Sequence, residues 1–162
     1  MLILRCTRRL LGRLPAPPVT KEDRSTTVLG DWYATILMVP PTHLILIVNE
    51  RSRLPVVLPA RELSTLLERI PVAVAGTLSD LGVAPEAIEH EAAKMRDIAC
   101  APTASRSALG AMNEFVFMIK CMREDGPFLH PRALSYRLSD TLVGVSTRNY
   151  QDPRDEVRRL LG

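Results

Sequence analysis

The hydrophobic pattern divides the chain into an N-terminal part rich in strands and a longer C-terminal part rich in helices. Short apolar runs with β-branched residues predict the strands. These are Leu2–Cys6, Trp32–Val39, Leu44–Asn49 and Leu54–Leu58. Residues 44–48 are apolar on both faces, so this strand should be central and covered on both sides. Pro55 and Pro59 cannot donate to a ladder, which places the last strand at an edge of the sheet.

Apolar residues at a spacing of three or four predict helices from Ala60 onward. The expected ranges are 60–70, 71–81, 85–99, 106–122, 131–142 and 153–161. Pro71 should separate the first two, because proline lacks an N–H and its ring clashes with the preceding turn. The helix from Arg106 to Met122 is apolar nearly all round, so we expect it to be the most buried one.

Strands followed by helices predict an α+β fold. We expect a small, mostly antiparallel sheet, made of the N-terminal strand and the hairpin strands, packed by a layer of four to six helices. The length of 162 residues fits a single domain over 1–162, with a mobile connection at 15–25 and a tail at 146–162 that ends in a short helix. Tyr33–Val48 is the one stretch apolar enough to suggest a membrane span. Pro40 and Pro41 interrupt it, so we expect a hairpin and no membrane segment.

The net charge, its distribution and the spacing of the cysteines indicate which partners, cofactors and location to expect. The net charge is +3, with nine basic and four acidic residues in 1–61 but three basic and seven acidic in 62–97. A basic end can contact nucleic acid. The small net charge and the 4% aromatic content argue against such a partner without excluding it. Cys6, Cys100 and Cys121 form no CxxC pair, and the histidines lie far apart, so we expect a cytoplasmic protein with no metal, no cofactor and no disulfide.

The standard catalytic motifs are missing from the sequence, and two polar clusters are the candidates for chemistry. The first lies on the helix that begins at Arg106, where Arg106, Asn113 and Glu114 interrupt an apolar pattern. Buried polar groups must be paired. Arg106 and Asn113 therefore either bond loop carbonyls and hold the helix in register, which we favour, or line a pocket. In that pocket Arg106 would bind an anion, and Asn113 and Glu114 would orient a substrate.

The second cluster is Asn49-Glu50-Arg51, which follows the most apolar strand. Functional residues often gather in such turns, because the scaffold is rigid and the loop is exposed to water. The same three residue types are also ordinary turn formers, which is the interpretation that we favour. Asp31-Trp32-Tyr33 poses the same choice, between a ligand anchor and a core segment, and we favour the core.

Three segments of the chain resemble a family of bacterial proteins known only as a domain of unknown function, with some members on plasmids or near mobile elements. The segments are 25–34, 48–51 with 54–57, and 106–115. The opening residues 1–7 also fit, so the likeness extends to about residue 145. In the family pattern an Asn precedes the Arg-Ser pair, where this chain has Ser105. The resemblance implies bacterial origin, a cytosolic location and no transmembrane segment, but no activity, cofactor or catalytic residue.

Two function classes remain open. One is a non-enzymatic protein-interaction or regulatory module with an unknown protein partner or a second copy of itself, since the apolar hairpin exceeds what one face of a small sheet needs. The other is a small hydrolase or nucleic-acid-processing enzyme with a polar site formed by the 49–51 turn and the 106–114 helix. The sequence does not decide whether the protein is an enzyme. A shared concave pocket would favour the enzyme, and a flat apolar patch would favour the interaction module.

Overall fold

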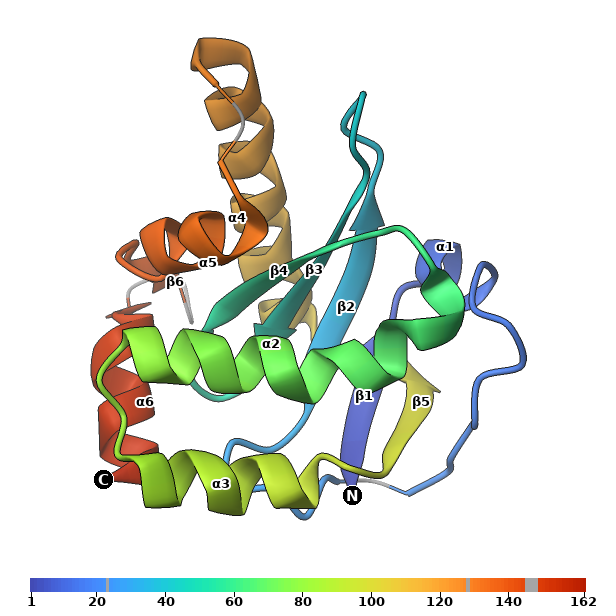
Figure 1. Ribbon diagram of the computed structural model, residues 1–162, viewed down its shortest axis with the longest axis vertical. Helices are drawn as coiled ribbons and strands as arrows, with labels where there is room; N and C mark the ends of the chain where they lie inside the picture. Colours follow the sequence, from blue (N-terminus) through green and yellow to red (C-terminus); the bar gives the residue numbers. More distant parts are fainter. Residues whose placement is uncertain (23, 128, 145–148) are drawn as a thin grey trace.

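The computed structural model describes residues 1–22, 24–127, 129–144 and 149–162. At its centre is a five-stranded sheet with the strand order β4-β3-β2-β1-β5 (Figure 1). The strands are β1 (Leu2–Cys6), β2 (Trp32–Leu37), β3 (Leu44–Asn49), β4 (Pro55–Pro59) and β5 (Ile98–Pro102). The first four lie where the sequence predicts them, with small shifts at their ends, and β4 is an edge strand as its prolines indicate.

The fold is α+β overall, but the sheet is mixed and not mostly antiparallel. β1 pairs in parallel with both β2 and β5, whereas β2–β3 and β3–β4 are antiparallel. The sequence prediction missed β5 and assigned its first two residues to the end of the helix predicted at 85–99, which as α3 ends at Lys94. A short apolar run can be a helix end or a buried strand, and a parallel partner reached by a long crossover leaves no local turn signal.

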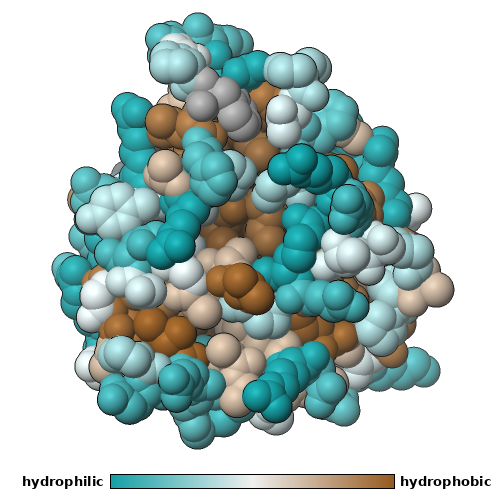
Figure 2. Space-filling view, viewed as in Figure 1, coloured by the Kyte–Doolittle hydropathy of each residue, from teal (hydrophilic) through white to brown (hydrophobic). Residues whose placement is uncertain are grey.

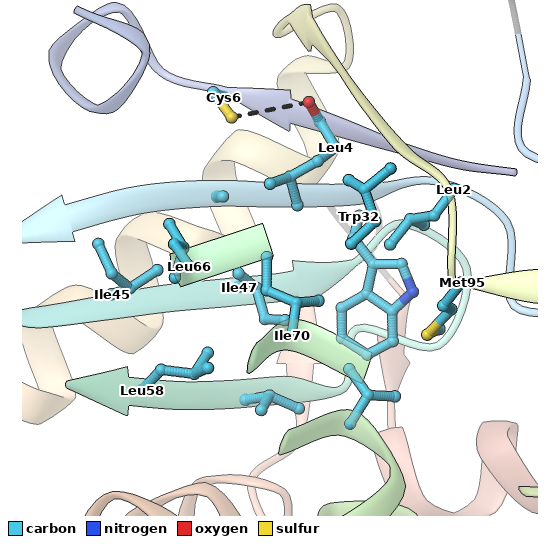
Figure 3. Packing of buried hydrophobic residues seen from close by; sticks show 14 of the residues in the cluster. Leu2, Leu4, Cys6, Trp32, Ile45, Ile47, Leu58, Leu66, Ile70 and Met95 are labelled. Atoms are coloured by element: carbon cyan, nitrogen blue, oxygen red, sulfur yellow. Dashed lines mark hydrogen bonds between the residues drawn. The ribbon is translucent and has the colours of Figure 1, made fainter. Parts of the chain in front are cut away.

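Helices cover both faces of the sheet instead of forming one layer. On one face, α2 (Leu66–Asp80), α3 (Pro85–Lys94) and α6 (Pro153–Leu161) contribute to the larger hydrophobic cluster. Trp32 is fully buried there, beside the side chains of Leu2, Ile70 and Met95 (Figure 3). The other face packs against α4 (Arg106–Asp125) and α5 (Pro131–Leu138). Every residue of β3 is buried, as predicted.

The double cover explains the apolar hairpin. Ile45 and Ile47 face the cluster under α2, while Leu46 and Val48 face the cluster under α4. Because alternate side chains of a strand point to opposite faces, a strand with a helical layer on each face needs apolar residues throughout. No second subunit is required to cover this hairpin, so it no longer argues for self-association.

Two helix predictions are wrong. Pro71 does not divide the 60–81 region into two helices. The helix α2 begins at Leu66, after a short 3₁₀ turn (Leu63–Thr65), and continues through Pro71 to Asp80. A proline near the start of a helix removes a single intrahelical bond, which the packing of α2 on the sheet outweighs. The helix α4 is also not the most buried one, since about half of its side chains are exposed to solvent and its C-terminal part extends past the sheet (Figure 1).

The remaining elements are short. They are α1 (Arg8–Leu11) and a two-stranded ribbon of β6 (Val143–Gly144) and β7 (Tyr150–Gln151). The terminal helix α6 has the predicted bounds, while residues 146–148 of the predicted tail lie outside the described residues. No helix within the described ranges is long and apolar enough to cross a bilayer.

Residues 18–20, within the connection predicted at 15–25, lie along the outer edge of β5. The Cys100 amide donates to the carbonyl of Pro18 at 2.6 Å, and the Thr20 amide donates to the carbonyl of Cys100 at 3.0 Å. Such pairing protects an edge strand from other chains. The predicted mobility of this connection stays a prediction.

Candidate functional site

A polar pocket of about 440 Å³ lies where β1 and β2 meet the 49–51 turn and the residues that lead into α4. We call it the polar pocket, and it has guanidinium, carboxylate and hydroxyl groups in its wall. Its lining residues are Arg5, Arg24, Ser25, Gly30, Asp31, Tyr33, Glu50, Arg51, Ala104 and Ser105. This volume suits a small molecule.

An ion pair between Arg5 of β1 and Asp31 lines part of the wall. Arg5 Nε donates to Asp31 Oδ2 at 2.7 Å. The other carboxylate oxygen of Asp31 accepts from both the amide and the hydroxyl of Ser25, each at 2.8 Å. Ser25 Oγ in turn accepts from the amide of Ile3 at 2.7 Å. Asp31 therefore holds the loop before β2 against β1, and its oxygens are occupied by the protein itself.

Tyr33 contributes a buried hydroxyl. Its oxygen accepts from the amide of Ser105, the N-cap of α4, at 2.9 Å. Burial raises the pKa of the Tyr33 hydroxyl above its ordinary value, and the nearby carboxylate of Glu50 raises it further. The hydroxyl therefore keeps its proton at neutral pH, which leaves an O–H donor beside the pocket.

Asn49 is a structural brace and not a pocket residue. It is fully buried, and its amide nitrogen donates to the carbonyl of Leu29 at 2.9 Å. Its side-chain oxygen accepts from the amides of Arg51 and Ser52 at 3.1 and 2.8 Å, and from the hydroxyl of Ser52 at 2.9 Å. These bonds fix the turn that presents Glu50 and Arg51 to the pocket.

Glu50 and Arg51 line the pocket, as one of the two sequence hypotheses requires. Arg51 is exposed, and its Nη1 donates to the carbonyl of Val28 at 2.9 Å. Its side chain crosses Gly30, where a Cβ would lie 3.2 Å from Arg51 Nε and the backbone has φ +77°. Glycine is therefore needed at this position. Over the described part of the chain, no hydrogen-bond or ion-pair partner contacts the carboxylate of Glu50 or the guanidinium of Arg24.

The structure does not bring Arg106, Asn113 and Glu114 into the pocket. All three side chains are exposed on α4 and absent from its lining. The bonds to loop carbonyls expected of Arg106 and Asn113 are not found among the described residues. The reason is the orientation of α4, which turns Ala108, Met112, Phe115 and Ile119 toward the sheet and these polar positions toward solvent.

Sequence reasoning missed other lining residues. Trp32 is a core residue as favoured, but Asp31 and Tyr33 on either side of it line the pocket. Arg5 and Arg24 were missed as well. A single arginine between Leu4 and Cys6 in an apolar strand is the one local signal that could have identified Arg5.

The side chain of Arg53 connects the 49–51 turn to the first turn of α4 without lining the polar pocket. It is 5% exposed and has a left-handed backbone with φ 61°. Its Nη2 donates to Ser107 Oγ at 2.8 Å, its Nη1 donates to the carbonyl of Glu50, and its buried Nε has no partner among the described atoms. Burial lowers the pKa of this guanidinium. Arg53 thereby sets the separation between the 49–51 turn and the first turn of α4.

Within the residues that the structure describes, no three His, Cys, Asp or Glu side chains are grouped so that they could hold an ion. Cys6, Cys100 and Cys121 are free thiols.

A protein-family model matches residues 3–156 of the chain, and its family is described as Domain of unknown function (DUF6933). The match confirms the resemblance to a domain-of-unknown-function family, while bacterial origin and a cytoplasmic location stay predictions. No curated protein and no solved structure matches the chain with significance.

Proposed function

The chain belongs to this family of unknown function, and from the polar pocket we propose that it is a non-enzymatic regulatory module that binds a small hydroxylated anion such as a sugar phosphate. The observation that carries the proposal is the set of charged side chains in the pocket that have no bonded partner of opposite charge among the described residues. Arg24 and Arg51 are exposed guanidiniums with no carboxylate bound to them in the described structure, and Glu50 is a carboxylate with no donor.

The charge pattern favours an anionic group at one end of the ligand. Asp31 is bound by Arg5 and Ser25, so it does not neutralise Arg24 or Arg51. Guanidinium groups bind phosphate through paired N–H donors. The N-terminus of α4, a helix of 20 residues, adds a partial positive charge beside Ser105.

The carboxylate of Glu50 and the hydroxyl of Tyr33 favour hydroxyl groups at the other end of the ligand. The carboxylate of Glu50 can accept from a ligand hydroxyl, and the protonated hydroxyl of Tyr33 can donate to a ligand oxygen. A sugar phosphate offers both features in a molecule that fits about 440 Å³.

The test is isothermal titration calorimetry with ribose 5-phosphate, ribose and inorganic phosphate as probes. Arg51→Ala should weaken ribose 5-phosphate binding roughly tenfold, since a charge-assisted hydrogen bond contributes about that factor. Arg9→Ala is the matched control, because Arg9 is equally exposed but does not line the pocket. Absence of binding by the unmodified protein, or an equal loss in both variants, would contradict the proposal.

A variant of Glu50 provides a second test of the proposal with the same probes. Glu50→Ala removes a charge that repels phosphate and an acceptor that binds hydroxyls. The affinity for inorganic phosphate should therefore rise, and the preference for ribose 5-phosphate over phosphate should fall. A uniform loss for both probes would show that Glu50 acts through the fold and not through a ligand.

The enzyme alternative predicts turnover that depends on Glu50. Ribose 5-phosphate incubated with excess protein should be recovered unchanged by phosphorus NMR if the protein is a binding module. Release of inorganic phosphate by the unmodified protein, and its loss in Glu50→Ala, would favour a small hydrolase instead.

A further inference from the structure

A second cavity, separate from the polar pocket, lies between α2 and α5 over the edge strand β4. Its volume is about 640 Å³, and we call it the edge groove. Figure 2 shows a hollow with apolar atoms at its base and a hydrophilic rim on the side of the molecule where α2 and α5 lie. The described lining includes Val57, Val72, Ala73, Gly76, Arg61 and Arg69.

The edge groove does not accept an added strand. Pro55 and Pro59 have no N–H, and the amide of Val57 donates to Ser135 Oγ at 2.8 Å. The backbone bonds at either end of the β3–β4 ladder direct the amides of Val56 and Leu58 toward β3. The outward edge of β4 therefore has no free amide donor, and strand addition needs such donors.

The base of the edge groove suits an apolar group. Val72 is 74% exposed, although it stands in the middle of α2. One turn later Gly76 has no side chain, and the guanidinium of Arg132 from α5 packs beside it, 3.6 Å from where a Cβ would lie. An exposed valine beside a hollow of this size is costly to leave in water and gains free energy when an apolar ligand covers it.

The rim is cationic. Arg69 donates to Thr65 Oγ1 at 3.2 Å and to the carbonyls of Pro59, Arg61 and Glu62 at 3.0, 2.7 and 3.4 Å, and no carboxylate of the described residues binds it. Arg61 is exposed and has no hydrogen-bond partner for its side chain in the described structure. Arg132 is neutralised by Asp80 at 2.7 Å, and Glu68 is the single carboxylate among the lining residues. The lining thus keeps an excess of positive charge next to an apolar base.

We infer that the edge groove binds a small amphipathic anion, with an apolar body against Val72 and β4 and a carboxylate at Arg61 and Arg69. Three features support this occupant: the volume, the closed strand edge and the cationic rim beside an apolar base. The inference does not depend on the function proposed for the polar pocket.

The experiment uses displacement of the fluorescent dye anilinonaphthalene sulfonate by decanoate, decanol and decyltrimethylammonium. Decanoate should bind more tightly than decanol, and decyltrimethylammonium should bind least. Val72→Glu should weaken decanoate roughly tenfold, because it places a negative charge and a polar group at the apolar base. Val19→Glu is the matched control, since Val19 is an equally exposed valine, at 69%, outside the groove.

The Arg61→Ala variant tests whether the edge groove recognises the negative charge of the ligand or only its apolar chain. It should bring the affinity for decanoate down to that for decanol and leave decanol unchanged. Equal binding of decanoate and decanol, or a decanoate affinity that Arg61→Ala does not alter, would overturn the inference. Arg51→Ala in the polar pocket should not affect decanoate, so that failure of either proposal can be distinguished from failure of the other.

Discussion

Arg5 and Asp31 form an ion pair that joins β1 to the loop before β2, with Arg5 Nε 2.7 Å from Asp31 Oδ2. The two side chains are 14% and 5% exposed. Because Asp31 also accepts two hydrogen bonds from Ser25, this carboxylate holds the loop that carries Arg24 and Gly30. The polar pocket is thus supported by a nearly buried charge pair and not by surface contacts alone.

Asp31→Ala should lower the free energy of unfolding by about 3 kcal/mol or more, since it leaves a nearly buried guanidinium without its carboxylate. Urea denaturation followed by circular dichroism measures the loss. Asp125→Ala, at an exposed aspartate with no bonded side chain in the described structure, is the control and should change the stability by less than about 0.5 kcal/mol. A loss below about 1 kcal/mol for Asp31→Ala would show that the pair is not needed.

Two asparagines provide a matched test of burial. Asn49 is fully buried and bonded to two neighbouring loops, whereas Asn113 is exposed on α4. Asn49→Ala should cost about 3 kcal/mol, because it orphans a buried carbonyl and a buried amide. Asn113→Ala should be neutral within about 0.5 kcal/mol. Thermal melts of both variants test this difference, and a loss of stability in Asn113→Ala would support the sequence prediction that Asn113 holds the helix in register.

The strands β1 to β4 were predictable because their signals are local. Residues 44–48 are apolar on both faces, a pattern typical of an interior strand in a sheet that is covered on both faces. β5 was not predictable, since its pairing with β1 depends on a partner almost a hundred residues away. The sequence of Ile98–Pro102 is equally compatible with the end of α3.

Only part of the candidate site could be predicted, because some of its residues come together through pairing between segments that are distant in the sequence. Glu50 and Arg51 follow a strand whose position the sequence indicates, so their place at a turn was expected. Arg5 reaches them only through the parallel pairing of β1 with β2, in which Arg5 lies opposite Tyr33. The error at Arg106 and Asn113 came from the rotation of α4, which is set by tertiary packing against the sheet.

The interior strand β3 allows a stringent test of the fold. Ile45→Asp places a charge under α2 with no partner, at a position that is fully buried. An unpaired buried charge costs several kcal/mol, so the variant should not fold. Val19→Asp, at an exposed valine, should keep the normal melting temperature. A soluble Ile45→Asp protein with an unchanged melting temperature would contradict the double cover of β3.

The hydroxyl of Tyr33 should ionise above the ordinary tyrosine pKa of about 10, because burial raises the pKa of this hydroxyl. A raised pKa in the folded state means that the folded protein holds this proton more tightly than the unfolded chain does. The corresponding stability is fully present below about pH 10 and is lost as the pH rises through the folded pKa. The difference in tyrosinate absorbance between the unmodified protein and Tyr33→Phe should therefore appear only above about pH 10. A difference that already appears around pH 10, with the protein still folded, would show that the Tyr33 hydroxyl is open to water.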